Sequence, residues 1–368
     1  MTSSTRIILV RHGRSTYNDQ GRYQGSSNHA LLTQKGIETA CQVGQSLRHV
    51  PIHAVYSSPL RRVTQTTDTI LRELGTGPKA LSIDENLREI DLSNWEGLSY
   101  QHVKEQFAED YRCWQEQPHE FELTRLQAQT RGSTAAVTEV KYYPVRSLYQ
   151  RAQQFWQTVL TQHAGQTVLV VSHGGTNHAL ISTALGLTPE HHHRLQQSNC
   201  GVSILEFTNW QVQIQQLNCT ASIKETLPKL KAGKQGLQLL LVAEEALSKD
   251  RAHTLADRLA AIAPNFCLAS REDLARKLLQ RCPTTLQLAT TKASFLLDWQ
   301  QSLEQSVRHQ SKLITGIAIA PTRSIQTLLM QTLGGQAQNS SQIRVESGKL
   351  SVVHYPSAHR PVVQAINF

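Results

Sequence analysis

Along the first 220 residues of the chain, short apolar runs typical of strands alternate with segments whose apolar residues have helical spacing. Short apolar runs predict strands at residues 6–10, 54–57, 167–172, 202–207 and 212–217. Helical spacing of apolar residues predicts helices at residues 33–48, 60–74, 146–162 and 175–185, the first capped by Thr33. Strands that alternate with helices predict an α/β fold, a mostly parallel sheet sandwiched by helices. Its reactive groups should lie at the carboxyl ends of the strands.

One segment, residues 124–141, has no clear periodicity. It is polar and rich in Ser and Thr, so we expect a long surface loop. Long loops in compact domains often act as lids, and the pattern leaves open whether this one covers a site.

The composition changes after Cys219. Residues 221–236 combine several lysines with Pro228, Gly233 and Gly236, which favours a linker. We therefore expect a catalytic domain at residues 1–220, a linker at 221–236 and a second domain at 237–368. In the second domain we expect strands at residues 237–242 and 314–320, and helices at 254–262, 271–280, 294–307 and up to residue 333.

The second domain repeats the pattern of the first. Residues 168–186 and 314–334 share an apolar strand, a helix and a final Leu-Gly, and residues 240–245 take the place of residues 9–13. A segment without histidine, Ala320-Pro-Thr-Arg323, replaces the histidine segment of the first domain. We interpret residues 237–368 as a second, smaller, degenerate and non-catalytic copy of the same fold. An unrelated α/β domain is the alternative.

The net charge of +9 limits the kinds of partner. Lysines and arginines form no stripe interleaved with aromatic residues, which argues against nucleic acid as a partner. We expect a solvated surface and a field that draws small anionic substrates into a cleft. No run approaches the roughly 18 apolar residues of a membrane span. The strand at residues 6–10 leaves no room for a targeting segment, so we expect a cytoplasmic protein.

Neither the cysteines nor the histidines predict a metal or another cofactor. The six cysteines are scattered without a C-x-x-C pair, which is typical of reduced thiols rather than a zinc site. The run His191-His192-His193 would point its side chains about 100° apart on a helix, so they cannot easily share one ion.

Two histidines end two of the predicted strands. His12 and His173 are each followed by glycine, and we expect Gly13 and Gly174 to let a substrate approach beside the imidazoles. Neighbouring parallel strands lie about 4.8 Å apart, so the two histidines could converge on one small ligand. A neutral imidazole can attack phosphorus and form a phosphohistidine.

Phosphoryl transfer also needs cations and a proton donor. Arg11, Arg61 and Arg62 are candidates for neutralising the phosphoryl oxygens, since a guanidinium bonds them in a bidentate way. A carboxyl group can protonate the leaving alkoxide and later deprotonate water. Spacing alone does not rank the three candidates, which are Glu89, Asp91 and Glu96.

Five ordered motifs resemble the histidine phosphatase superfamily, also called phosphoglycerate mutase-like. They are Arg-His-Gly at residues 11–13, residues 18–25, Ser-Ser-Pro-Leu-Arg-Arg at 57–62, Leu-Arg-Glu with Trp-Glu-Gly at 87–97, and Ser-His-Gly-Gly at 172–175. The resemblance implies that His12 is the phosphorylated nucleophile and that Glu89 is the proton donor. It implies that the residues holding the phosphoryl group are Arg11, Arg62 and His173. It further implies a substrate pocket lined by Asn18, Gln24, Gly25 and Gly174.

Residues 87–92, 114–118, 143–146 and 197–207 resemble a narrower group, the 2-carboxyarabinitol-1-phosphate phosphatases and the related phosphoserine phosphatases. That resemblance implies a small phosphomonoester substrate that carries a carboxylate. The chain departs from the superfamily at Arg14, where most members have an acidic or amide residue. Arg14 could pair with a substrate carboxylate or could be an exposed surface residue, and the neighbouring Ser15 is a further candidate for substrate binding.

Two other functions are alternatives to a phosphatase. One is a phosphoglycerate mutase, which re-transfers the phosphoryl group without releasing it. The other is a regulatory or binding protein on a phosphatase scaffold. The sequence also leaves open whether the chain forms a homodimer.

Overall fold

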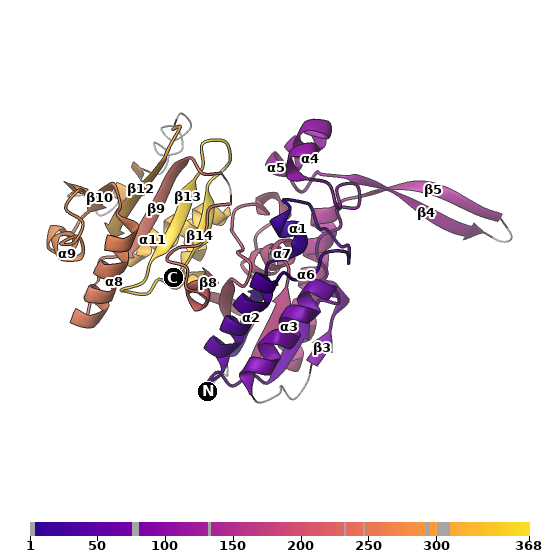
Figure 1. Cartoon of the computed structure of the whole chain (residues 1–368), viewed down its shortest axis with the longest axis horizontal. Coiled ribbons are helices and arrows are strands. Elements are labelled where there is room, and N and C mark those ends of the chain that lie inside the picture. Colours follow the sequence, from indigo (N-terminus) through magenta and orange to yellow (C-terminus); the bar gives the residue numbers. More distant parts are fainter. Residues whose placement is uncertain are drawn as a thin grey trace.

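The computed structural model describes residues 4–75, 81–131, 134–231, 233–245, 247–290, 295–296, 298–299 and 310–368. It contains two α/β bodies side by side and a long β-hairpin that projects from the first body (Figure 1). Within these ranges, no helix is both long and apolar enough to cross a bilayer.

The first body is built on a six-stranded sheet with the order β3-β2-β6-β1-β7-β8. Its strands are β1 (Thr5–Arg11), β2 (Ala54–Ser57), β3 (Leu81–Ile83), β6 (Thr167–Ser172), β7 (Val202–Thr208) and β8 (Gln211–Cys219). The first four are mutually parallel, whereas β7 runs antiparallel to β1 and to β8. The predicted α/β fold with a mostly parallel sheet is confirmed.

Helices cover both faces of this sheet. Ile8 and Val10 of β1 pack toward α2 (Gln34–Leu47) and α3 (Arg61–Leu74), whereas Ile7 and Leu9 pack toward the other two long helices. Those two are α6 (Pro144–Gln162) and α7 (Gly174–Ala184). Shorter elements complete the body: α1 (Thr16–Asp19), η1 (Glu85–Leu87), α4 (Tyr100–Gln106), α5 (Ala108–Glu116), η2 (Pro189–His191) and η3 (Ala221–Ile223). Thr33 caps α2 as predicted, because its hydroxyl accepts a hydrogen bond from the Gly36 N–H at 3.1 Å.

The predicted loop at residues 124–141 is wrong. This segment forms an antiparallel hairpin of β4 (Leu123–Arg131) and β5 (Thr134–Tyr142), paired from Leu123–Tyr142 to Arg131–Thr134. The segment is polar in sequence and its strands pair with each other through the backbone, so periodicity alone did not reveal them. The hairpin points away from the body (Figure 1), so this arrangement does not support a lid over the site.

The second body repeats the topology of the first. Its sheet has the order β11-β10-β12-β9-β13-β14, and each strand has the same direction as its counterpart. Its elements are β9 (Gly236–Ala243), α8 (Lys249–Ile262), β10 (Phe266–Ala269), α9 (Glu272–Leu278), β11 (Leu286–Ala289), β12 (Leu313–Ala320), α11 (Thr322–Leu333), η4 (Ala337–Gln342), β13 (Ser351–Tyr355) and β14 (Val362–Ala365). The degenerate second copy is therefore confirmed at the level of the fold. The helix predicted at residues 294–307 falls mostly outside the described residues.

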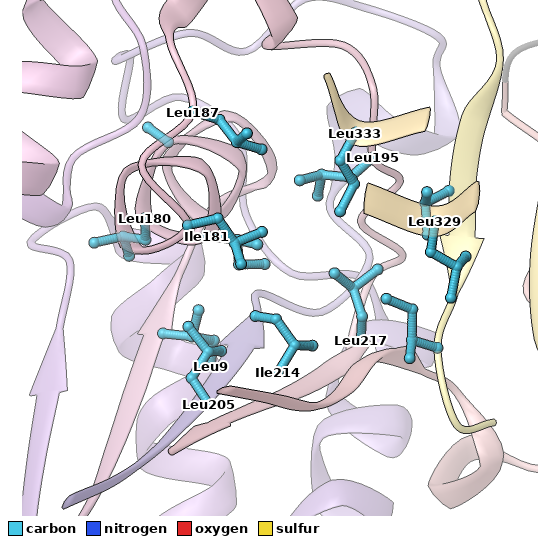
Figure 2. Close-up of a cluster of buried hydrophobic side chains, with 14 of the residues drawn as sticks. Leu9, Leu180, Ile181, Leu187, Leu195, Leu205, Ile214, Leu217, Leu329 and Leu333 are labelled. Carbon is cyan, nitrogen blue, oxygen red and sulfur yellow. The ribbon is translucent and has the colours of Figure 1, made fainter. Parts of the chain in front are cut away.

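One hydrophobic core joins the two bodies. Leu329 and Leu333 of α11 lie in the same buried cluster as Leu195 and Leu217 of the first body (Figure 2). The segment expected to be a linker is held by both bodies. The Gln196 side chain donates to the Lys229 carbonyl at 3.0 Å, and the Gln364 side chain donates to the Pro228 carbonyl.

Candidate active site

The two strand-end histidines face each other. The strands β1 and β6 are parallel neighbours, with Arg11 opposite Ser172, so His12 and His173 leave the sheet side by side. Their ring centroids lie 5.3 Å apart and both residues are buried. The convergence expected from strand spacing is present.

The hydrogen bond of His12 identifies its tautomer. Its Nδ1 atom lies 2.7 Å from the Gly13 carbonyl oxygen, which can only accept. The proton is therefore on Nδ1, and in the neutral ring the Nε2 atom carries a free lone pair. This is the form that a nucleophilic imidazole requires.

Charge and burial keep His12 in that form. Burial, and then the guanidinium groups of Arg62 and Arg11, hold the pKa of His12 well below its usual range. The same influences lower the pKa of His173. Both rings are therefore neutral at physiological pH.

The guanidinium of Arg62 is held by the loop that contains Gly25 and Ser27. Its Nη1 and Nη2 atoms donate to the carbonyls of Ser27 and Gly25, both at 2.8 Å, and the side chain is fully buried. Burial lowers the pKa of Arg62 to about 10, so it stays charged at neutral pH. The neighbouring Arg61 is exposed, which agrees with the choice of Arg62.

The carboxylate of Glu89 lies at the N-terminus of α7. It accepts hydrogen bonds from the N–H groups of Gly175 and Thr176, both at 3.1 Å. His173 is the N-cap residue of the same helix, and its Nε2 lies 2.7 Å from the Ser58 hydroxyl. A β-carbon on Gly175 would lie 2.6 Å from the Glu89 Oε1, so glycine is needed for this approach. The helix N-terminus thus places an acid–base group and an imidazole beside an anion-binding position.

Three buried nitrogens of these residues have no hydrogen-bond partner among the described residues. They are Arg11 Nε, Arg62 Nε and His173 Nδ1. All three can donate a hydrogen bond to an acceptor such as a phosphoryl oxygen.

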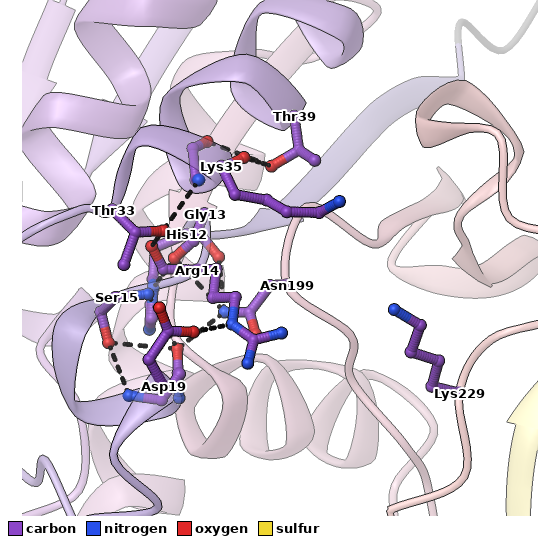
Figure 3. Close-up of polar contacts among 12 residues, drawn as sticks. His12, Gly13, Arg14, Ser15, Asp19, Thr33, Lys35, Thr39, Asn199 and Lys229 are labelled. Atoms are coloured by element: carbon purple, nitrogen blue, oxygen red, sulfur yellow. Dashed lines mark hydrogen bonds and ion pairs between the residues drawn. The ribbon is translucent and has the colours of Figure 1, made fainter.

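The pocket residues predicted after His12 form one hydrogen-bonded network. Ser15 caps α1, and its hydroxyl donates to Gln24 Oε1 at 2.7 Å. Asn18 closes the cap, and its Oδ1 accepts from Asn199 Nδ2 at 3.0 Å. Figure 3 shows how Asn199 lies between this loop and the His12–Gly13 backbone.

Gly13 has a different role from the one predicted. A β-carbon there would lie 2.5 Å from the Gly36 carbonyl oxygen, so Gly13 is required by the close packing of the loop on α2 rather than by substrate access. At Gly174 a β-carbon would lie 3.3 Å from Arg11 Nε, so that position does border the phosphoryl-binding side chains.

Arg14 does not join the other candidate residues. Its guanidinium is ion-paired with Asp19 (Figure 3), and both side chains are 45% exposed. Of the two alternatives for Arg14, the structure shows the exposed one, with a surface partner.

Sequence reasoning missed Lys231. The Nζ of Lys231 donates to the Gln197 carbonyl, and Arg11 Nη1 donates to the same oxygen at 2.7 Å. The lysine belongs to the charged run that we interpreted as a linker, so its position gave no signal. Ser58 and Asn199 were also missed, although both lie in segments that carried the family resemblance.

A cavity of about 970 Å³ adjoins the site at Lys231. Its walls come from α5, from residues 190–196 and from residues 355–362 of the second body. Arg112, Arg194 and Arg360 line it together with Lys231. His12 does not line it, so this cavity lies beside the phosphoryl site.

The His191-His192-His193 run has structural contacts. His192 is buried against Trp114 and Tyr149, and His193 Nε2 lies 2.8 Å from the Trp114 carbonyl, to which it donates. Within the described ranges, no three side chains form a metal-binding group.

Comparisons with known proteins find relatives of this chain among phosphatases. The chain is 36% identical to the 2-carboxy-D-arabinitol-1-phosphatase of Triticum aestivum over 252 residues, which cover 67% of this chain and 47% of that protein. It is 30% identical to phosphoserine phosphatase 1 of Hydrogenobacter thermophilus, over 60% of this chain and 95% of that one. A solved phosphoserine phosphatase of Entamoeba histolytica aligns with 25% identity and a TM-score of 0.47, covering 60% of this chain and 99% of that one.

The chain thus spans about half the length of the wheat relative, and most of a bacterial one. The family model of the histidine phosphatase superfamily, branch 1, matches residues 7–220. That range is more than half of the chain and contains every residue of the site except Lys231. We conclude that this chain belongs to the histidine phosphatase superfamily.

Proposed function

We propose that this protein is a phosphomonoester hydrolase that works through a phosphohistidine on His12. One observation carries the proposal: a buried, neutral His12 whose Nδ1 bonds Gly13 O, with its free Nε2 beside two arginines and a second histidine. The phosphatase names of the relatives support it.

The reaction would proceed in two displacements. Nε2 of His12 attacks phosphorus and the bond from phosphorus to the ester oxygen breaks, while Glu89 gives its proton to the leaving alkoxide. Water then attacks the phosphohistidine, Glu89 takes a proton from that water, and phosphate leaves with His12 restored. Arg11 and Arg62 offset the negative charge of the phosphoryl oxygens in both steps. No step in this scheme needs a metal ion.

The substrate we propose is a small phosphomonoester with a carboxylate, such as 2-carboxyarabinitol 1-phosphate or phosphoserine. The relatives' names support both compounds. Lys231 beside Arg11 offers a partner for the carboxylate, since the two side chains share one carbonyl acceptor.

The test measures phosphate release in EDTA from these two compounds, 3-phosphoglycerate, sugar bisphosphates and an aryl phosphate. We expect a preference of about a hundredfold for one carboxylate-bearing ester, equal to ~2.7 kcal/mol in transition-state binding. Conversion of 3-phosphoglycerate to 2-phosphoglycerate without phosphate release would instead establish a mutase.

Two variants test the assigned roles. His12→Ala should abolish turnover and prevent labelling of the protein by a ³²P substrate. Glu89→Gln should retain labelling from an aryl phosphate, whose leaving group needs little protonation, and should slow hydrolysis of alkyl esters. Wild-type turnover by His12→Ala would overturn the mechanism.

A further inference from the structure

The two bodies meet at equivalent edge strands. The first sheet ends in β8, and the second sheet ends in its counterpart β14. Leu217 N–H donates to the Ile366 carbonyl at 3.0 Å, and Ile366 N–H donates to the Leu217 carbonyl at 3.1 Å. This antiparallel bridge joins the sheets at the centre of the interface.

Strand register shows that the two bridged residues are counterparts. Arg11 opposite Ser172 corresponds to Ala243 opposite Ala320. From this starting pair, the register of the neighbouring strands makes Ile204 of β7 the counterpart of Val352 of β13. Ile204 pairs with Gln216 of β8, and Val352 pairs with Ala365 of β14, so Gln216 and Ala365 are counterparts too. The next residue along each edge strand is Leu217 in one body and Ile366 in the other. The bridge therefore pairs one position with its own counterpart, as a two-fold axis does in an isologous dimer.

A second main-chain hydrogen bond around this axis also occurs twice. Gln196 N–H donates to the Val363 carbonyl at 2.9 Å, and its counterpart Arg344 N–H donates to the Ile214 carbonyl at 3.0 Å. Val363 and Ile214 are themselves counterparts, since each pairs with the equivalent residue of β13 and β7. Leu329 and Leu333 of the second body lie in one buried cluster with Leu195 and Leu217 of the first (Figure 2).

Two buried asparagines repeat the same exchange with their side chains. Asn218 Nδ2 donates to the Gln364 carbonyl at 2.8 Å, and Asn367 Nδ2 donates to the Gln215 carbonyl at 2.6 Å. Both residues have a positive φ, 51° and 54°. Each also accepts a hydrogen bond at Oδ1, from Ser198 N–H in the first body and from Glu346 N–H in the second.

Only one of the two asparagines is connected to catalytic groups. Asn218 accepts a hydrogen bond from Ser198, and the residues on either side of Ser198 are hydrogen-bonded to residues of the active site. The Gln197 carbonyl accepts from Arg11, and the Asn199 side chain donates to the carbonyl of His12. In the second body, Glu244 takes the place of His12. The Glu244 N–H donates to the Ala320 carbonyl, just as the His12 N–H donates to the Ser172 carbonyl.

We propose that the second body occupies the place of a second subunit in an internal isologous dimer, and that Asn218 is a positioning residue through which it aligns Arg11 and His12. The partner that covers the edge strand β8 is thus a copy of the same fold. The role in catalysis rests on the proposed phosphatase function.

The symmetry supplies a matched pair of variants in the full-length chain, Asn218→Gly and Asn367→Gly. Glycine tolerates the positive φ, and each change removes the same two kinds of hydrogen bond, one across the interface and one within its own body. We expect a similar fall in melting temperature for both. We expect Asn218→Gly alone to lower kcat/KM for an aryl phosphate about tenfold, which is ~1.4 kcal/mol, mostly in kcat. Asn367→Gly should stay within about twofold of wild type.

The outcomes separate the two proposals. Equal losses of kcat/KM in both variants, or no loss in Asn218→Gly, would overturn the positioning role. An inactive wild type would count against the phosphatase proposal and not against the symmetry. If either glycine variant fails to fold, the milder pair Asn218→Ser and Asn367→Ser carries the same comparison.

Discussion

At the scale of single residues, two basic side chains of the site share one hydrogen-bond acceptor. Arg11 and Lys231 donate to one carbonyl, that of Gln197, which brings two basic side chains together. Desolvation, and then the charge of Arg11, hold the pKa of Lys231 well below its usual range, and a bound anion would favour the charged form, so the pair favours a ligand with negative charge.

This arrangement gives a prediction for Lys231. Lys231→Met should raise KM about tenfold for phosphoserine or 2-carboxyarabinitol 1-phosphate, and leave KM for an aryl phosphate nearly unchanged. The control is Lys229→Met, because Lys229 is exposed and ion-paired with Glu225 at 3.6 Å. An equal rise for both kinds of substrate would mean that Lys231 acts through Arg11 and not on the carboxylate.

How far the sequence predicted this site depends on how local each contact is. His12, Arg11, Arg62, Glu89 and His173 stand in short ordered motifs, and the structure brings all five together. Ser58 bonds His173 across 115 residues, and Asn199 bonds His12 across 187. Such long-range pairings depend on chain topology, which spacing in one sequence does not reveal.

At the scale of secondary-structure elements, predictions succeeded where one face is apolar. The helices α2 and α6 and the strand β6 were confirmed because the core selects their periodicity. The hairpin β4–β5 was missed because its strands pair with each other away from that core.

The hairpin can therefore be shortened in an experiment. Thr124 and Lys141 are paired, so an Asn-Gly turn in place of residues 125–140 would close the strands. We expect kcat/KM for a small phosphomonoester within about twofold of wild type and a similar melting temperature. A large loss of activity would restore the interpretation of this segment as a lid.

At the scale of the whole molecule, buried histidines tie stability to pH. Burial, followed by neighbouring basic side chains, holds the pKa values well below 6.5 for His12, His173, His178 and His192. Burial lowers the pKa of His193 to about 4. Below pH 6.5 the unfolded chain binds protons that the folded chain does not, so the free energy of unfolding falls as the pH falls.

We therefore expect the melting temperature to drop steeply between pH 6.5 and pH 5.5. Each such histidine contributes up to about 1.4 kcal/mol per pH unit to the loss of unfolding free energy. Calorimetry at constant ionic strength measures this slope. Replacing the buried His192 with Met should flatten this slope. A slope unaltered by His192→Met would contradict the assignment.

The two-fold bridge has a consequence for how mutations combine. Because Leu217 and Ile366 face each other across it, exchanging them leaves the same atoms at the same junction, only reversed. Leu217→Ile and Ile366→Leu should each disturb the packing when made alone, and together they should largely compensate. A destabilising substitution in one half of the chain would then be offset by the matching substitution in the other half.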